Sequence, residues 1–106
     1  LDPASVEARI TPRTRAIIVV DLFGQPYDAD AINAIAEKHG LMVIEDCAQA
    51  PGAFYKGKSG QGRWAGTLAH MGVYSLNYHK HIHTGEGCVV VTDDDILAEK
   101  LRMIRN

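Results

Sequence analysis

Residues 16–46 read AIIVVDLFGQPYDADAINAIAEKHGLMVIED, and this stretch decides the fold class. Residues 16–20 form a continuous apolar run that is rich in β-branched side chains, and residues 41–44 form a second apolar run. Uninterrupted runs of this kind are typical of strands that are buried on both faces of a parallel sheet. The residues between the two runs carry apolar side chains at helical spacing. The stretch therefore predicts a strand, a helix and a second strand.

The boundaries of this helix are marked by residues with known capping preferences. Either Asp28 or Asp30 can cap its amino end, and Gly40 can end it. Ile32 and Ile35 lie on its apolar face, together with Ala36. A short strand–helix–strand unit joins parallel neighbours by a right-handed crossover, and ligands bind beyond the carboxyl ends of such strands. The fold class predicted is therefore α/β, with a mainly parallel sheet flanked by helices.

Further elements are predicted on both sides of this unit. Asp2 and Pro3 are typical of the start of a short helix. Residues 51–72 hold six of the ten glycines and predict a long ordered loop. Two further strands are predicted at residues 72–76 and 89–92. A final helix begins at one of residues 93–95, with three apolar side chains predicted to face inward: Leu97, Leu101 and Ile104.

Composition excludes several classes of protein. The formal net charge is -2 and the basic residues are scattered, so the sequence lacks the basic surface that nucleic acids require. No apolar run approaches the ~20 residues that span a bilayer. Cys47 and Cys88 lie in apolar strand-like stretches, which predicts buried reduced thiols and a cytoplasmic protein. The chain begins at Leu1 and ends within a predicted helix, so we expect it to be a segment of a longer protein.

The second strand ends in the sequence EDCAQ at residues 45–49. A carboxylate at the end of a buried strand needs a hydrogen-bonded or positively charged partner. Asp46 can therefore cap the loop that follows, or it can pair with a cationic group of a ligand. The sequence leaves both roles open.

A lysine lies in a polar turn between the last two predicted strands. Residues 74–87 read YSLNYHKHIHTGEG, with Lys80 at the centre. Most loop lysines are simply solvated. At the ligand-binding edge of a sheet, however, a partly desolvated lysine near cationic groups can lose its proton and act as a nucleophilic amine. Lys80 is therefore a candidate for Schiff-base chemistry.

Together, these two segments resemble the DegT/StrS-type nucleotide-sugar aminotransferases, which depend on pyridoxal phosphate (PLP) and have the aspartate-aminotransferase fold. In that family a strand ending in Glu-Asp-x-Ala-Gln is followed, some thirty residues later, by a serine, a lysine five positions on and a Gly-Glu-Gly-Gly turn. The matching segments here are residues 45–49, Ser75 with Lys80, and residues 84–87. Residues 10–14, 24–26 and 55–58 also resemble the family, so the likeness covers essentially the whole chain.

The resemblance implies that residues 1–106 are a central fragment of the PLP-binding large domain of a fold-type I transferase. It implies that Lys80 forms the internal aldimine and that Asp46 pairs with the pyridine nitrogen. Ser75 would bind the cofactor phosphate, and Gln49 would contact the ring or its phenolic oxygen. No metal ion is expected in this site.

By the same resemblance, the parent protein transfers an amino group from an amino acid to a keto group of a nucleotide-linked sugar. Such enzymes serve the synthesis of lipopolysaccharide or antibiotic sugars, and a homodimer is expected. Three residues depart from the family pattern. Asp21 stands where histidine is frequent, His70 where aspartate is frequent, and Cys88 where the last glycine of the turn is expected.

Four alternatives compete with this interpretation. Residues 52–59 match the phosphate-binding P-loop pattern, although no helical pattern follows them. His79, His81 and His83 alternate as in a metal-binding strand, but a turn does not keep strand alternation. A keto-sugar dehydratase of the same family would have histidine in place of Lys80. A non-catalytic module with the same fold is the fourth alternative.

Overall fold

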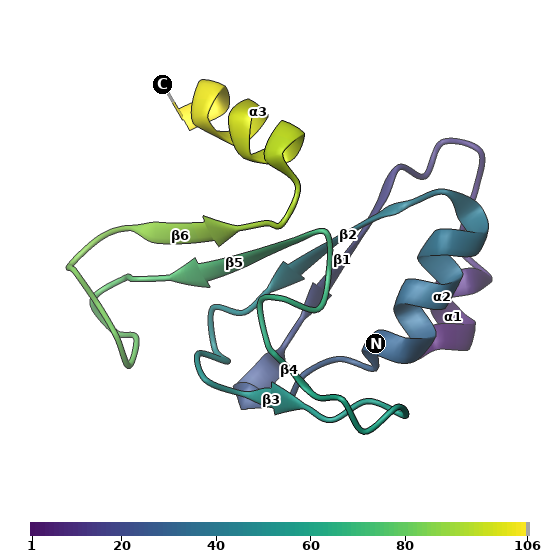
Figure 1. The fold of residues 1–106 in the computed structure, drawn as a ribbon, viewed down its shortest axis with the longest axis horizontal. Helices are drawn as coiled ribbons and strands as arrows, with labels where there is room; N and C mark the ends of the chain where they lie inside the picture. Colours follow the sequence, from purple (N-terminus) through teal and green to yellow (C-terminus); the bar gives the residue numbers. More distant parts are fainter. Residues whose placement is uncertain (106) are drawn as a thin grey trace.

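The computed structural model describes residues 1–105, which form a four-stranded sheet with helices and a small hairpin around it (Figure 1). The strands are β1 (Ala16–Val20), β2 (Met42–Asp46), β5 (Met71–Ser75) and β6 (Cys88–Val91), in the order β1-β2-β5-β6. β1, β2 and β5 are parallel, whereas β6 is antiparallel to β5. The predictions of parallel neighbours and of a mainly parallel sheet are confirmed.

Helix α2 (Ala29–His39) is the crossover between β1 and β2. Its amino end is capped by Asp28, whose Oδ1 accepts the backbone N–H of Ala31 at 3.1 Å. Gly40 ends the helix in the left-handed conformation, with φ of 62°, where a residue with a Cβ atom would be strained. Of the two predicted caps, Asp28 is therefore the one that the structure uses.

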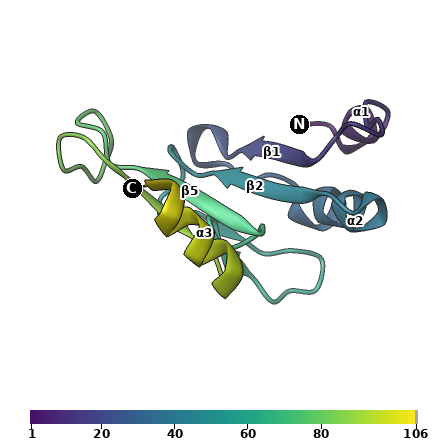
Figure 2. The ribbon, with the colours of Figure 1, turned by 90° about the horizontal axis from the view of Figure 1, so that it is seen from above.

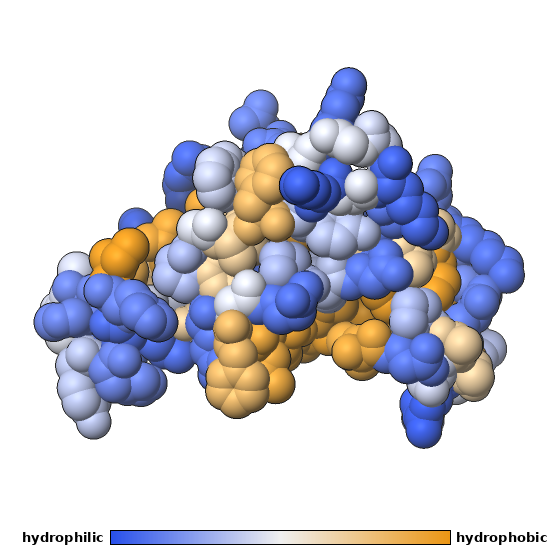
Figure 3. Space-filling model, turned by 90° about the horizontal axis from the view of Figure 1, so that it is seen from below, coloured by the Kyte–Doolittle hydropathy of each residue, from blue (hydrophilic) through white to orange (hydrophobic). Residues whose placement is uncertain are grey.

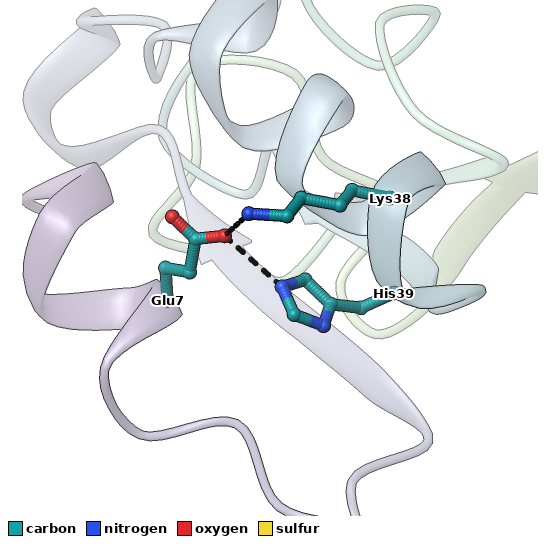
Figure 4. A network of polar contacts seen from close by, with 3 residues as sticks. All are labelled: Glu7, Lys38 and His39. Atoms are coloured by element: carbon teal, nitrogen blue, oxygen red, sulfur yellow. Dashed lines mark hydrogen bonds and ion pairs between the residues drawn. The ribbon is translucent and has the colours of Figure 1, made fainter.

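Helix α1 (Pro3–Glu7) is fastened to α2 by one carboxylate (Figure 4). Glu7 Oε1 lies 2.7 Å from Lys38 Nζ and 3.0 Å from His39 Nε2. These two hydrogen bonds hold the pKa of Glu7 below its ordinary value. Because the group is exposed, this network positions α1 more than it stabilises the fold.

The two faces of the sheet differ in how well they are covered. Along β1, Ile17 and Val19 are buried, whereas Ile18 and Val20 are 63% and 47% exposed. Strand side chains alternate between faces, so the buried set faces α2 and the exposed set faces away from it. Ile18 and Val20 thus leave apolar surface on the sheet face that α2 does not cover. Apolar side chains also reach the surface on the side of the molecule seen from below, where they lie between polar regions (Figure 3).

The final helix, α3 (Asp95–Arg105), begins where predicted, since Asp94 Oδ1 accepts the backbone N–H groups of Ile96 and Leu97. The prediction that Ile104 faces inward is wrong, because this side chain is 81% exposed. α3 follows the edge strand β6 and has no buried residue. No helix among residues 1–105 is long and apolar enough to span a bilayer.

The glycine-rich segment contains a small hairpin of β3 (Phe54–Tyr55) and β4 (Arg63–Trp64), stabilised by an edge-to-face contact of Phe54 and Trp64. This hairpin is incompatible with a P-loop, which must open a helix. In addition, the backbone N–H of Lys58 donates to Asp30 Oδ2 at 2.7 Å. This backbone N–H group is therefore already paired with a carboxylate.

Candidate active site

The carboxyl ends of the three parallel strands meet at one edge of the sheet (Figure 2). In the strand register, Val20 lies beside Asp46, and Asp46 lies beside Val73. The segments that follow β1, β2 and β5 consequently leave the sheet at the same edge. All four residues proposed from the sequence belong to β2, β5 or the segments that follow these two strands.

Asp46 is the last residue of β2 and its side chain is half-buried. Its Oδ1 accepts the backbone N–H of Ala48 at 3.0 Å, so Asp46 caps the loop that follows β2. Gln49 lies in that loop, and its Oε1 accepts the backbone N–H of Phe23 at 2.9 Å. This bond ties the loop after β2 to the short 3₁₀ helix η1 (Leu22–Gly24) after β1.

Ser75 and Lys80 line a cavity of about 370 Å³, which lies between β5 and the loop after β2. Most of its other walls are apolar, and they include Trp64, Tyr74 and Ile82. The volume lies within the range of small-molecule sites, about 300–1,000 Å³. The structure thus brings Ser75 and Lys80 together at one pocket.

Asp46 and Gln49 do not line this cavity, although Cys47 does. Successive side chains at the end of a strand point to opposite faces of the sheet. Cys47 is fully buried on the α2 side, whereas Asp46 shares the less covered face with Ile44. Asp46 pairs with Val73 in the strand register, so Ser75, two residues further along β5, lies on the same face of the sheet as Asp46. The structure therefore places the four residues at one edge, with Asp46 and Ser75 on the less covered face.

The turn that carries Lys80 is held by hydrogen bonds around Asn77. The backbone N–H of Lys80 donates to Asn77 O at 2.9 Å, and the backbone N–H of Asn77 donates to Ser75 Oγ at 3.3 Å. Asn77 Nδ2 donates to Glu86 Oε2 at 3.0 Å. Lys80 is half-buried. Asn77 therefore connects Ser75 with Lys80. The sequence did not identify Asn77 as a site residue.

The three histidines of the turn are exposed, and none belongs to a cluster of potential metal ligands within residues 1–105. The cluster found there consists of Asp21, Glu45 and Cys47, whose ligand atoms lie within 4.8 Å of one another. Both carboxylate oxygens of Glu45 already accept backbone N–H groups, from Gly66 at 2.8 Å and Leu68 at 3.0 Å. This arrangement favours a structural role for Glu45.

Asp21 is the partner of Glu45 in this cluster, and both side chains are fully buried. Asp21 Oδ1 accepts the backbone N–H of Tyr27 at 2.9 Å, and Oδ2 lies 3.7 Å from the Cys47 sulfur. Burial, reinforced by Glu45, raises the pKa of Asp21 to about 6. Burial also raises the pKa of the Cys47 thiol. Below that pH, Asp21 can therefore donate a hydrogen bond to Glu45.

The sequence interpretation noted Asp21 only as a departure from the family pattern. The sequence did contain a signal for a functional or buried carboxylate at this position, because Asp21 directly follows a buried strand and Asp46 lies at the end of another. What the sequence could not show is that two carboxyl groups from neighbouring strands meet on the α2 side.

His70 and Cys88, the other two residues that depart from the family pattern, lie outside the cluster of Asp21, Glu45 and Cys47. His70 Nδ1 accepts the backbone N–H of Val43 at 3.0 Å, at the amino end of β5 and away from the candidate site. Cys88 pairs with Ser75 in the strand register and is exposed, so the prediction of a buried thiol is wrong for Cys88. It is correct for Cys47. Cys88 is exposed because it begins the edge strand β6.

We expect the effect of Asp21→Asn on stability to depend on pH. A carboxyl group whose pKa is raised on folding stabilises the native state at low pH, and this contribution is lost as pH rises toward the folded pKa. The relevant window runs from the ordinary value of 3.8 to about 6. Asparagine mimics the protonated acid at every pH. From pH 4 to pH 7, the variant should therefore gain about 2–3 kcal/mol relative to wild type.

Urea unfolding of both proteins across this pH range measures the difference. Asp28→Asn serves as the matched control, because Asp28 is an exposed cap and the substitution also replaces a carboxylate by an amide. A difference between Asp21→Asn and wild type that stays constant from pH 4 to pH 7 would contradict the raised pKa of Asp21.

Comparison with known proteins identifies the family of this chain. The model of the DegT/DnrJ/EryC1/StrS aminotransferase family matches residues 1–106. The chain is 48% identical over 105 residues to GDP-perosamine synthase of Caulobacter vibrioides, covering 99% of this chain and 27% of that protein. It is 50% identical over 106 residues to a pleiotropic regulatory protein of Geobacillus stearothermophilus, again covering 99% of this chain and 27% of the relative.

A solved structure gives the same result at the level of the fold. The aminotransferase from Psychrobacter cryohalolentis superposes with a TM-score of 0.87 at 44% identity, and the match covers 96% of this chain and 25% of that one. The chain thus spans about a quarter of the length of these relatives. Since the family model matches every residue of the sequence, the chain belongs to the DegT/DnrJ/EryC1/StrS aminotransferase family.

Proposed function

We propose that the parent protein of this chain is a PLP-dependent aminotransferase that acts on a nucleotide-linked keto sugar. One observation carries the proposal. The parallel strands β2 and β5 are neighbours, so Asp46 and Gln49 leave the sheet at the same edge as Ser75 and Lys80. Residues 1–106 would then be the central part of the PLP-binding large domain.

The side chains at this edge suit the chemical groups of PLP. The cofactor has an aldehyde, a phosphate and a pyridine nitrogen, which require an amine, a hydrogen-bond donor and a carboxylate. Ser75 Oγ accepts the backbone N–H of Asn77, so its own hydrogen remains available for a phosphate oxygen. Asn77 Oδ1 is buried and has no hydrogen-bond partner among residues 1–105. A buried acceptor without a partner is costly, so we expect a donor from another part of the parent protein to complete it.

Each of these residues would have a distinct task. When bound, PLP supplies a conjugated ring that takes up negative charge from the reacting carbon of the substrate. Asp46 would keep a proton on the ring nitrogen, since an adjacent carboxylate favours the charged form. Lys80 would hold the cofactor covalently and carry the proton that moves between the reacting carbon of the substrate and the cofactor. Gln49 would donate from Nε2 toward the phenolic oxygen, since its Oε1 is taken by Phe23.

The substrate class rests on the relatives. The protein from Caulobacter vibrioides is a GDP-perosamine synthase, which supports a sugar carried on a nucleotide as the amino acceptor. An amino acid such as glutamate would be the donor. We also propose a cytoplasmic homodimer serving lipopolysaccharide or antibiotic sugar synthesis, a proposal that rests on family membership. Exposed apolar side chains on the uncovered face, such as Ile18, would be covered by other parts of the parent.

The keto-sugar dehydratase differs from this proposal in a single residue. It would need histidine where Lys80 stands, and His79 and His81 are the neighbours that a shift of register would bring there. Lys80 lines the cavity, however, whereas both histidines are exposed outside it. This placement favours amino transfer.

Borohydride trapping tests the proposal directly. The full-length parent is incubated with PLP, reduced with borohydride and digested, and the modified peptide is identified by mass spectrometry. We expect the reduced adduct on Lys80, and we expect amino transfer from glutamate to a nucleotide-linked keto sugar. An adduct on another lysine, or cofactor that is released intact after reduction, would refute the role of Lys80.

A further inference from the structure

Asn77 connects three segments of the candidate site. Its backbone N–H binds Ser75 Oγ, its backbone carbonyl accepts the N–H of Lys80, and its side chain donates to Glu86. The first two bonds use backbone atoms, which any residue other than proline could supply. Only the bond to Glu86 requires the asparagine side chain.

Glu86 is itself held in place at the base of the loop. The backbone N–H of Leu76 donates to Gly87 O at 2.8 Å, and that of Thr84 donates to Leu76 O at 3.0 Å. Thr84 Oγ1 donates to the carbonyl of Glu86 at 2.8 Å. Glu86 is therefore attached to the end of the sheet, and it provides a fixed point for the tip of the loop.

The tip of the loop, which carries Lys80, is largely exposed. The exposed side chains of Tyr78, His79 and Ile82 lie on either side of Lys80. A hydrogen bond that restricts an exposed segment reduces the number of backbone conformations open to it. The bond from Asn77 to the carboxylate of Glu86 is charge-assisted, which makes it stronger than a bond between neutral groups.

We infer that Asn77 and Glu86 are positioning residues, whose side-chain hydrogen bond orients the turn so that the amine of Lys80 faces the cofactor aldehyde. This inference rests on the proposed function, because it assumes that Lys80 is the residue that binds the cofactor. Both residues act through Lys80.

The test separates covalent attachment of the cofactor from simple binding. The apo form of the full-length parent is mixed with PLP, and the appearance of the lysine–cofactor absorbance band is followed. Affinity is measured separately with pyridoxine 5′-phosphate, which has an alcohol in place of the aldehyde. We expect Asn77→Ala to slow attachment about three- to tenfold, a loss typical of one charge-assisted hydrogen bond. Its affinity for pyridoxine 5′-phosphate should stay within about twofold, because the backbone bond to Ser75 remains.

A double-mutant cycle assigns the effect to the bond itself. Glu86→Ala should match Asn77→Ala, and the double variant should be no slower than either, because all three lack the same bond. Glu86→Gln keeps an oxygen acceptor and should recover most of the rate. Glu99→Ala is the control, since it removes an exposed carboxylate on α3 whose side chain accepts a hydrogen bond from Arg102.

Three results would overturn the inference. One is attachment by Asn77→Ala at the wild-type rate. Another is a parallel loss of rate and of affinity for pyridoxine 5′-phosphate, which would assign Asn77 to binding as a whole. The third is additive losses in the double variant. Failure of the proposed function looks different, because the wild-type protein would then form no adduct on Lys80 at all.

Discussion

Replacing Lys80 by alanine in the full-length parent should abolish the borohydride-reducible adduct and lower amino transfer by at least about a thousandfold, as expected when a covalent catalyst is removed. Lys80→Arg should be equally inactive, because it keeps the positive charge but offers no amine that can be deprotonated. Lys80 is half-buried in the wall of a cavity that it shares with Ser75. The loss should therefore come from chemistry, with little change in folding.

Lys58→Ala is the matched control for this experiment. Lys58 is exposed on the β3–β4 hairpin, and the hydrogen bond that it makes to Asp30 comes from its backbone N–H. The substitution removes a lysine side chain of the same length and keeps that bond. Activity of this variant should equal wild type. Substantial amino transfer by Lys80→Ala would show that another group holds the cofactor.

Asp46→Asn should lower kcat about 10²- to 10³-fold and leave the fold intact, since the loss of one preorganised electrostatic contact is of this size. An amide oxygen can still accept the backbone N–H of Ala48, so the capped loop after β2 is retained. An amide cannot keep the ring nitrogen protonated, because it carries no negative charge. The cofactor should still attach to Lys80, which separates this variant from Lys80→Ala.

Steady-state kinetics measures the expected loss of kcat, and circular dichroism tests whether the fold is intact. Asp28→Asn makes the same change at another capping residue, the exposed residue that caps the start of α2. Its kcat should match wild type. Near-normal turnover by Asp46→Asn would remove Asp46 from the site and leave it only the capping role that the structure shows.

The elements of the fold could be predicted because their signals are local. The apolar β-branched run at residues 16–20 forms β1, and Asp28 and Gly40 bound α2 as their capping preferences indicate. The boundaries of β2, β5 and β6 each shift by one or two residues from the prediction. The prediction for Ile104 failed for a different reason. Helical spacing shows which side chains share a face, but it does not show whether a neighbouring element covers that face.

For the candidate site, too, local features could be predicted and contacts between distant segments could not. Its residue types and spacing, with Asp46 at a strand end and Lys80 five positions after Ser75, can be read from the sequence because they are properties of short segments. Their position at one edge of the sheet also follows, since parallel strands end together. The sequence itself determined these features of the protein.

Only the tertiary structure decided what surrounds these residues. It placed Cys47 in the cavity wall and Asp46 on the other face, and it joined Asp21 to Glu45 across two strands. It also brought Asn77 to Glu86 across the base of a loop. These relations depend on strand pairing and on exclusion of water by distant segments, and desolvation of this kind is what shifts the pKa of Asp21. Local sequence patterns carry no record of such contacts, because each requires two segments that meet only after the chain has folded.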